Sequence, residues 1–256
     1  LKTPGLGRAD VWVFDTDALG DNPGGEPLAI VNLFADSVRG LARNADGSRV
    51  YAAAFLSGNQ TTILLNEAPV ANAKPAPVQN QQGVRQPDTG LIVGFDGGRW
   101  VDEAGNDWSE KVRFNLPDDD LFTLDAMAEV PQLLGRQQGL GTVLFNVASN
   151  PVTGAVYVSN TEARNRVRFE GPGKSASSVR GHITEHRISV LQGNAMVTNH
   201  LNPHVDFSLP EGAALASNDK RMSLAQPQDM AVSTDGKTLY LAAFGSNRIA
   251  AIATAS

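Results

Sequence analysis

The chain has 256 residues, 41% of them hydrophobic and 19% charged, a balance that excludes a disordered polypeptide and allows a large buried core. Its formal net charge of −6 argues against a nucleic-acid partner, because phosphates require a basic surface. The absence of cysteine excludes disulfides, thiolate catalysis, cysteine-rich zinc sites and covalent c-type haem attachment.

In chain order, the first strand is predicted at Val11–Ala18, where apolar and polar residues alternate. Leu41–Phe55 then reads as a strand, a polar turn and a second strand. Asn66–Gly90 contains four prolines and almost no hydrophobic alternation, so we predict a surface insertion there. Leu91–Arg99 and Lys111–Asn115 are weaker strand candidates.

The second half of the chain repeats these features. Leu121–Ala126 resembles the first predicted strand, and Val147–Thr161 repeats the strand, turn and strand pattern. Glu170–Gly181 is rich in Gly and Ser and is predicted as a second surface insertion. Arg187–Leu191 alternates as a strand does, and Met230–Phe244 is the third strand-turn-strand segment.

Signals for helices, membrane spans and targeting are scarce. Only Leu124–Gly135 is predicted as a short helix. No stretch approaches the ~18 consecutive apolar residues of a membrane helix, so no membrane span is expected. The chain begins with Leu1 and shows no signal peptide, so we expect a processed chain or an excerpt of a longer one.

The three tyrosines of the chain occupy one position in the three strand-turn-strand segments. Tyr51, Tyr157 and Tyr240 each follow a turn glycine after two or three residues. Repetition of a hairpin is typical of repeat architectures, and each interval between tyrosines accommodates about two propeller blades. The sequence therefore predicts an all-β fold. We expect one β-propeller domain over residues 1–256, with four-stranded antiparallel blades, of which about five to six are visible.

The turns resemble a known family. Tyr157–Asn160 reads Tyr-Val-Ser-Asn, Ser233–Tyr240 matches S-x-D-G-x-x-L-Y, and Asn44–Tyr51 is a looser copy. These segments resemble the YVTN family of bacterial β-propeller repeats. The resemblance implies a seven-bladed propeller, complete or in part, from a periplasmic, extracellular or cell-surface protein. Because fewer than seven blades are visible, we expect a missing part or a partner that closes the ring.

Histidines supply the candidate metal site. All four fall in one window, as two H-x-x-x-H pairs: His182, His186, His200 and His204. That spacing chelates a metal from one face of a helix, whereas on one strand the two imidazoles lie ~13 Å apart. The window reads as strand and loop, so a transition-metal site requires histidines from adjacent strands. The alternative is that each histidine hydrogen-bonds to nearby backbone.

Acidic residues form two clusters that are candidate calcium sites, because calcium prefers oxygen ligands. The alternative is that these aspartates form turns and cap their own backbone. The first cluster surrounds a Gly/Pro turn and consists of Asp15, Asp17, Asp21 and Glu26. The second cluster is the run of three aspartates Asp118–Asp120.

Two further groups are candidates for contact with a partner. Arg164, Arg166 and Arg168 alternate and so share one face of a predicted strand. They would either meet an acidic partner or form a solvated edge that prevents sheet-to-sheet aggregation. Trp100 and Trp108 bracket a Gly/Asp-rich loop and would either anchor a partner or pack against a blade.

No motif supports nucleophilic catalysis or phosphate binding, since G-x-S-x-G and G-x-x-x-x-G-K are both missing. We therefore expect a non-catalytic binding or structural scaffold of an exported bacterial protein, with a protein partner, another copy or part of the same chain bound to it. One alternative is a metal-dependent lactonase-like hydrolase, whose ligands must converge within ~5 Å at one end of the channel. The other, implied by the resemblance, is a segment of a larger redox protein with a haem peroxidase-like module.

Overall fold

The computed structural model describes residues 9–64, 91–102, 105–113, 115–163, 184–206 and 217–254. These residues form antiparallel β-strands almost throughout, with one short helix, α1 (Ser217–Met222), and one 3-10 turn (Phe244–Ser246). The prediction of an all-β, propeller-like fold is confirmed. Both predicted surface insertions lie outside the described residues. Within the described ranges, no helix is long and apolar enough to cross a membrane.

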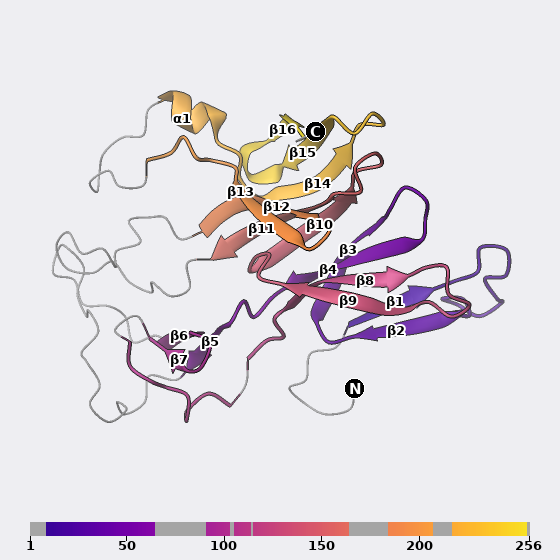
Figure 1. Ribbon diagram of the computed structural model, residues 1–256, viewed down its shortest axis with the longest axis horizontal. Coiled ribbons are helices and arrows are strands. Elements are labelled where there is room, and N and C mark those ends of the chain that lie inside the picture. The colour runs from indigo at the N-terminus through magenta and orange to yellow at the C-terminus, as the bar shows by residue number, and fades with distance from the viewer. Residues whose placement is uncertain are drawn as a thin grey trace.

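An eight-stranded sheet forms the centre of the molecule (Figure 1). It consists of two four-stranded meanders, which are joined where Val143 pairs with Leu56. In each, neighbouring strands pair antiparallel in chain order. The first four-stranded sheet consists of β3 (Asp36–Arg43), β4 (Arg49–Leu56), β8 (Asp119–Asp125) and β9 (Gln132–Gln138). The second four-stranded sheet consists of β10 (Val143–Ser149), β11 (Val156–Ala163), β12 (Thr184–Gln192) and β13 (Ala195–His200).

Three smaller sheets complete the fold. The N-terminal sheet and the C-terminal sheet flank the two meanders, and the small sheet lies in the long connection between β4 and β8 (Figure 1). The N-terminal sheet contains β1 (Ala9–Val13) and β2 (Ala29–Leu33). The C-terminal sheet contains β14 (Pro227–Val232), β15 (Thr238–Ala243) and β16 (Arg248–Ala253). The small sheet contains β5 (Thr61–Leu64), β6 (Leu91–Phe95) and β7 (Trp100–Val101).

Four blade-like units stack in the described part of the chain: the N-terminal sheet, the two halves of the eight-stranded sheet and the C-terminal sheet. The small sheet interrupts the first of these halves between its second and third strands and has a core of its own, with Val93 and Trp108. The expectation of about five to six blades stays a prediction for the whole chain. The short helix predicted at Leu124–Gly135 is wrong, because that segment is the end of β8, a turn and the start of β9.

Apolar layers fill the spaces between successive sheets. Because side chains alternate across a strand, each strand supplies one set of residues to the layer before it and the other set to the layer after it. The three layers contain Val11, Val31, Ala52 and Phe122; then Tyr51, Leu121, Leu144 and Val158; and then Tyr157, Ile188, Leu239 and Leu241. Tyr51 and Tyr157 both point toward the next sheet in the chain.

The turns of the repeat have the predicted chemistry. Gly47, Gly154 and Gly236 adopt φ values of 75°, 74° and 73°, a conformation that favours glycine. Asp46 and Asp235 accept hydrogen bonds from the backbone N–H groups two residues later in the chain. In the hairpin with Gly154, Asn150 takes this role and accepts a hydrogen bond from the Val152 N–H. Each of the three hairpins places its tyrosine on the same face of its own sheet.

Candidate functional site

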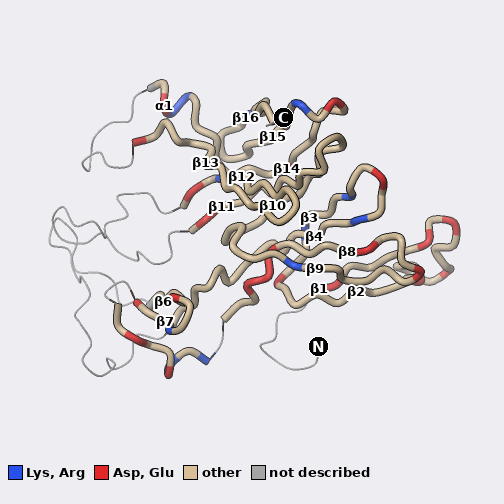
Figure 2. The backbone as a smooth tube through the Cα atoms, viewed as in Figure 1, with Lys and Arg blue, Asp and Glu red and all other residues tan. Residues whose placement is uncertain are grey.

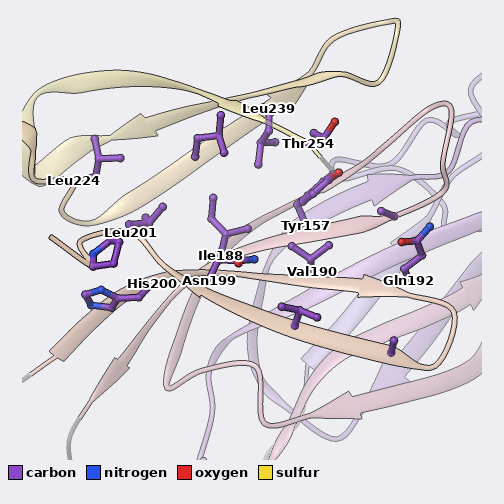
Figure 3. A pocket seen from close by; sticks show the side chains of 16 residues that line it. Tyr157, Ile188, Val190, Gln192, Asn199, His200, Leu201, Leu224, Leu239 and Thr254 are labelled. Carbon is purple, nitrogen blue, oxygen red and sulfur yellow. The ribbon is translucent and has the colours of Figure 1, made fainter. Parts of the chain in front are cut away.

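A groove of about 610 Å³ opens between the second four-stranded sheet and the C-terminal sheet (Figure 3). One wall comes from β12 and β13, with Ile188, Val190 and Val197, and the other comes from β15 and β16, with Leu239 and Ile252. The groove continues the third apolar layer outward to solvent. Its lining is therefore predominantly apolar, as is typical of binding sites.

The groove exists because the two sheets differ in width. The second four-stranded sheet reaches outward to β13, whereas β16 is the outermost strand of the C-terminal sheet and pairs only with β15 among the described residues. Residues of β16 alternate, so that Ile252 faces the groove while Ile249 and Ala251 face away from it. The groove thus borders an unpaired strand edge.

One of the three described histidines lines this groove, and all three bond to backbone. His200 lines the groove, and its Nδ1 accepts a hydrogen bond of 3.2 Å from the Asn202 N–H. His186 Nδ1 accepts from the Gln226 N–H at 3.4 Å, and His204 Nε2 donates to the Asp219 carbonyl at 3.1 Å.

Burial, and secondarily the neighbouring His200, lower the pKa of His186, so that its imidazole is neutral at pH 7. Within the described residues, no three or more His, Asp or Glu side chains are arranged to hold a metal ion. His182 lies outside the described residues, so the four-histidine site stays a prediction.

The tryptophans lie away from the groove, at the small sheet. Trp108 is 5% exposed, and its Nε1 donates a hydrogen bond of 3.1 Å to Asp102. Trp100 is half-buried and packs on Phe95, with ring centroids 5.4 Å apart. These contacts favour the packing interpretation of the pair. Arg164, Arg166 and Arg168 lie outside the described residues.

The acidic loop of the first cluster joins β1 and β2 and is exposed (Figure 2). Asp15 accepts a hydrogen bond from the Asp17 N–H at 2.9 Å, and Glu26 accepts one from Asn22 at 2.7 Å. Both contacts hold the loop to itself. They favour the turn-capping interpretation of these acidic residues.

The second acidic cluster is bound by its own chain. Asp118 accepts a hydrogen bond of 2.8 Å from the Gln60 N–H, and Asp119 forms an ion pair of 3.0 Å with Arg136. Asp120 is fully buried, and its Oδ2 accepts from the Leu140 N–H at 2.7 Å.

Burial raises the pKa of Asp120 to about 6, although hydrogen bonds from Ser57 and Leu140 favour the charged form. Burial also raises the pKa of Asp118. Carboxyl groups with raised pKa values occur at functional sites and in structural networks alike. Here the backbone partners of both groups indicate a structural network.

One polar network between the two four-stranded sheets is absent from the sequence-based predictions. Arg187 Nη2 donates to Glu162 and to the Leu140 carbonyl, each at 2.9 Å, and Asn59 hydrogen-bonds to the same Glu162 carboxylate. Burial raises the pKa of Glu162, and the Arg187 charge opposes that rise. Asn59 and Glu162 are 103 residues apart, and no motif links them.

Comparisons with known proteins give no family. No protein-family model and no curated protein matches the chain. Among solved structures, it is similar to the hydrazine synthase of Kuenenia stuttgartiensis, with 13% identity and a TM-score of 0.40 over 88% of this chain and 55% of that one. The chain thus spans about half of that protein.

Two bacterial proteins assigned as 6-phosphogluconolactonases are also similar. The one from Bacteroides fragilis NCTC 9343 has 10% identity and a TM-score of 0.30, over 97% of this chain and 73% of that one. The one from Bacteroides uniformis ATCC 8492 has 12% identity and a TM-score of 0.30, over 97% and 77%. Similarity at this level says nothing about activity. The YVTN resemblance therefore depends on the repeats in the sequence alone.

Proposed function

We propose that this protein is a non-catalytic, propeller-like scaffold whose groove binds an extended apolar segment of a protein partner. The observation that carries the proposal is the apolar groove of about 610 Å³ bordering an edge of β16 with which no described strand pairs. Export to the periplasm or cell surface is part of the proposal and is supported by the YVTN-like repeats.

The groove and the edge together suit binding by strand addition. An extended segment added to β16 would give the C-terminal sheet a fourth strand, like the fourth strands β9 and β13 of the complete sheets. The main chain of the segment would bond to the edge, and every second side chain would point into the groove. Val190 and Val197 on the opposite wall offer apolar contact to those side chains.

The lining favours binding over the alternative of metal-dependent hydrolysis. Of the described residues that line the groove, none is Asp or Glu, and the ionisable side chains are His200 and Tyr157. The carboxyl groups with raised pKa, Asp118, Asp120 and Glu162, are absent from this lining and bond to other parts of the chain. Hydrolase and haem-linked redox functions stay predictions from the family resemblance.

Binding of a six-residue peptide in which valine and threonine alternate tests the proposal. We expect Val197→Glu to weaken the affinity at least about tenfold, because Val197 lines the groove and is 58% exposed, so that a charge there is desolvated by the peptide. Fluorescence anisotropy of the labelled peptide measures the change.

The matched control is Met196→Glu, at a neighbouring exposed position of β13 that does not line the groove. A second peptide with N-methylated alternate residues loses the main-chain hydrogen bonds and should bind weakly. The absence of peptide binding, or equal effects of the two glutamate variants, would show that the groove does not bind extended segments.

A further inference from the structure

The third tyrosine of the repeat differs from the other two in its surroundings. Tyr51 and Tyr157 are 8% and 5% exposed, because each is covered by the next sheet, whereas Tyr240 is 47% exposed. Tyr240 lies on the face of the C-terminal sheet opposite to Leu239 and Leu241, which pack in the third layer. No sheet in the described part of the chain covers this face.

The uncovered face has the composition of a packing surface. Across the strands, Tyr240 lies beside Ala231 and Ala251, and Ile249 is 80% exposed. The one acidic residue of the three strands, Asp229, is hydrogen-bonded to Asn146 of β10. The face therefore presents one aromatic ring, one large aliphatic side chain, several alanines and Thr238.

The opposite end of the stack also exposes apolar side chains, and no sheet among the described residues covers it. Asp10 and Asn32 share this face and hydrogen-bond to each other. Val11 and Val31 of the N-terminal sheet pack inward, so Trp12 and Ile30 point outward, where they face each other across the two strands. Trp12 is 52% exposed, Ile30 is 44% exposed, and the adjacent Leu28 is 59% exposed. Large apolar side chains thus project from this end of the molecule, whereas small ones dominate the other end.

We propose that the Tyr240 face of one copy of this chain packs on the Trp12 face of a second copy, head to tail, in a closed ring of two. The contact would continue the series of apolar layers already present between the sheets of one chain. Head-to-tail contacts between identical chains either close into rings or extend into filaments. With the eight-stranded sheet counted as its two halves, the described strands of two copies supply eight stacked units, which is at the upper end of the roughly four to eight blades of known propellers.

This interface is separate from the groove and does not depend on peptide binding. Sedimentation equilibrium of the purified 256-residue chain is expected to give twice the monomer mass. Ile249→Glu and Trp12→Glu should each raise the concentration needed for association at least about tenfold, because each places a charge in an apolar contact. Met127→Glu, at a 73% exposed position between β8 and β9 and so outside the strands of both faces, is the matched control and should leave the mass unchanged.

Mixing the variants tests the head-to-tail geometry. An equimolar mixture of Ile249→Glu and Trp12→Glu retains one intact pair of faces and should form a heterodimer that neither variant forms alone. Circular dichroism shows that both variants are folded. A monomeric parent chain, filaments in place of dimers, or a dimer that Trp12→Glu leaves intact would each overturn the proposal.

Discussion

Replacing Tyr157 with alanine is expected to lower the free energy of unfolding by about 3–4 kcal/mol, and Tyr51→Ala by about 3 kcal/mol. Both rings are buried between sheets, so their removal leaves cavities in rigid layers. Tyr157 also lies 3.3 Å from Asn150 Nδ2, which donates a hydrogen bond to its hydroxyl. Tyr240→Ala should cost less than about 1 kcal/mol, because that ring is half exposed.

Urea denaturation measures the three values, and the Ile249→Glu background keeps the protein monomeric so that association does not contribute. Tyr157→Phe is the control for the hydroxyl group, and we expect a loss of about 1 kcal/mol from the missing hydrogen bond. Equal losses for the three alanine variants would contradict the inference that Tyr240 lies on an uncovered face of the single chain.

The sequence predicts the parts of this fold that are local. Hairpin turns depend on adjacent residues. Two of the turns in the structure are therefore predicted by the Asp-Gly pairs Asp46-Gly47 and Asp235-Gly236. Strand alternation is local too, and it places Leu121–Ala126 on β8 almost to the residue. The layered, all-β architecture follows from these two signals together.

The blade count and the polar contacts between sheets are not local, and the sequence does not reveal them. In a strand such as β6, apolar and polar residues alternate in the same way whether the strand belongs to a blade or to an insertion. The pattern therefore does not indicate which strand it pairs with. Asn150 shows the same limit. It reads as a turn residue, yet it also donates to the Gly236 carbonyl of the C-terminal sheet, 86 residues away.

The candidate site was predicted least well, for a related reason. The groove is a space between two sheets, lined by common apolar residues such as Val190 and Ile252 that carry no motif. The spacing of the histidines suggested a metal site. The described histidines bond to backbone, which is the alternative given for them in the sequence analysis. Of the described histidines, only His200 lines the groove.

Asp120→Asn is expected to stabilise the protein above pH 6, by about 2–3 kcal/mol at pH 8. The folded state raises the pKa of Asp120 to about 6, from 3.8, because the carboxyl group is fully buried. Folding therefore favours the protonated form. The contribution of this group to stability is fully present below about pH 4, falls as the pH rises to 6, and is constant above that.

Asparagine retains an oxygen for the Leu140 N–H and removes the ionisation, so the variant should lose the pH dependence while matching the parent near pH 4. Urea denaturation at pH 4, 5, 6 and 8 gives the difference between the two proteins. Asp120→Ala leaves the buried Leu140 N–H without its acceptor and should be destabilised at every pH. Asp46→Asn is the exposed control, since hydrogen bonds from Ser48 lower the pKa of Asp46, and its effect must have the opposite sign. If the parent chain is as stable as Asp120→Asn at pH 8, the prediction is wrong. The surrounding hydrogen bonds would then offset the cost of burying the ionised carboxylate.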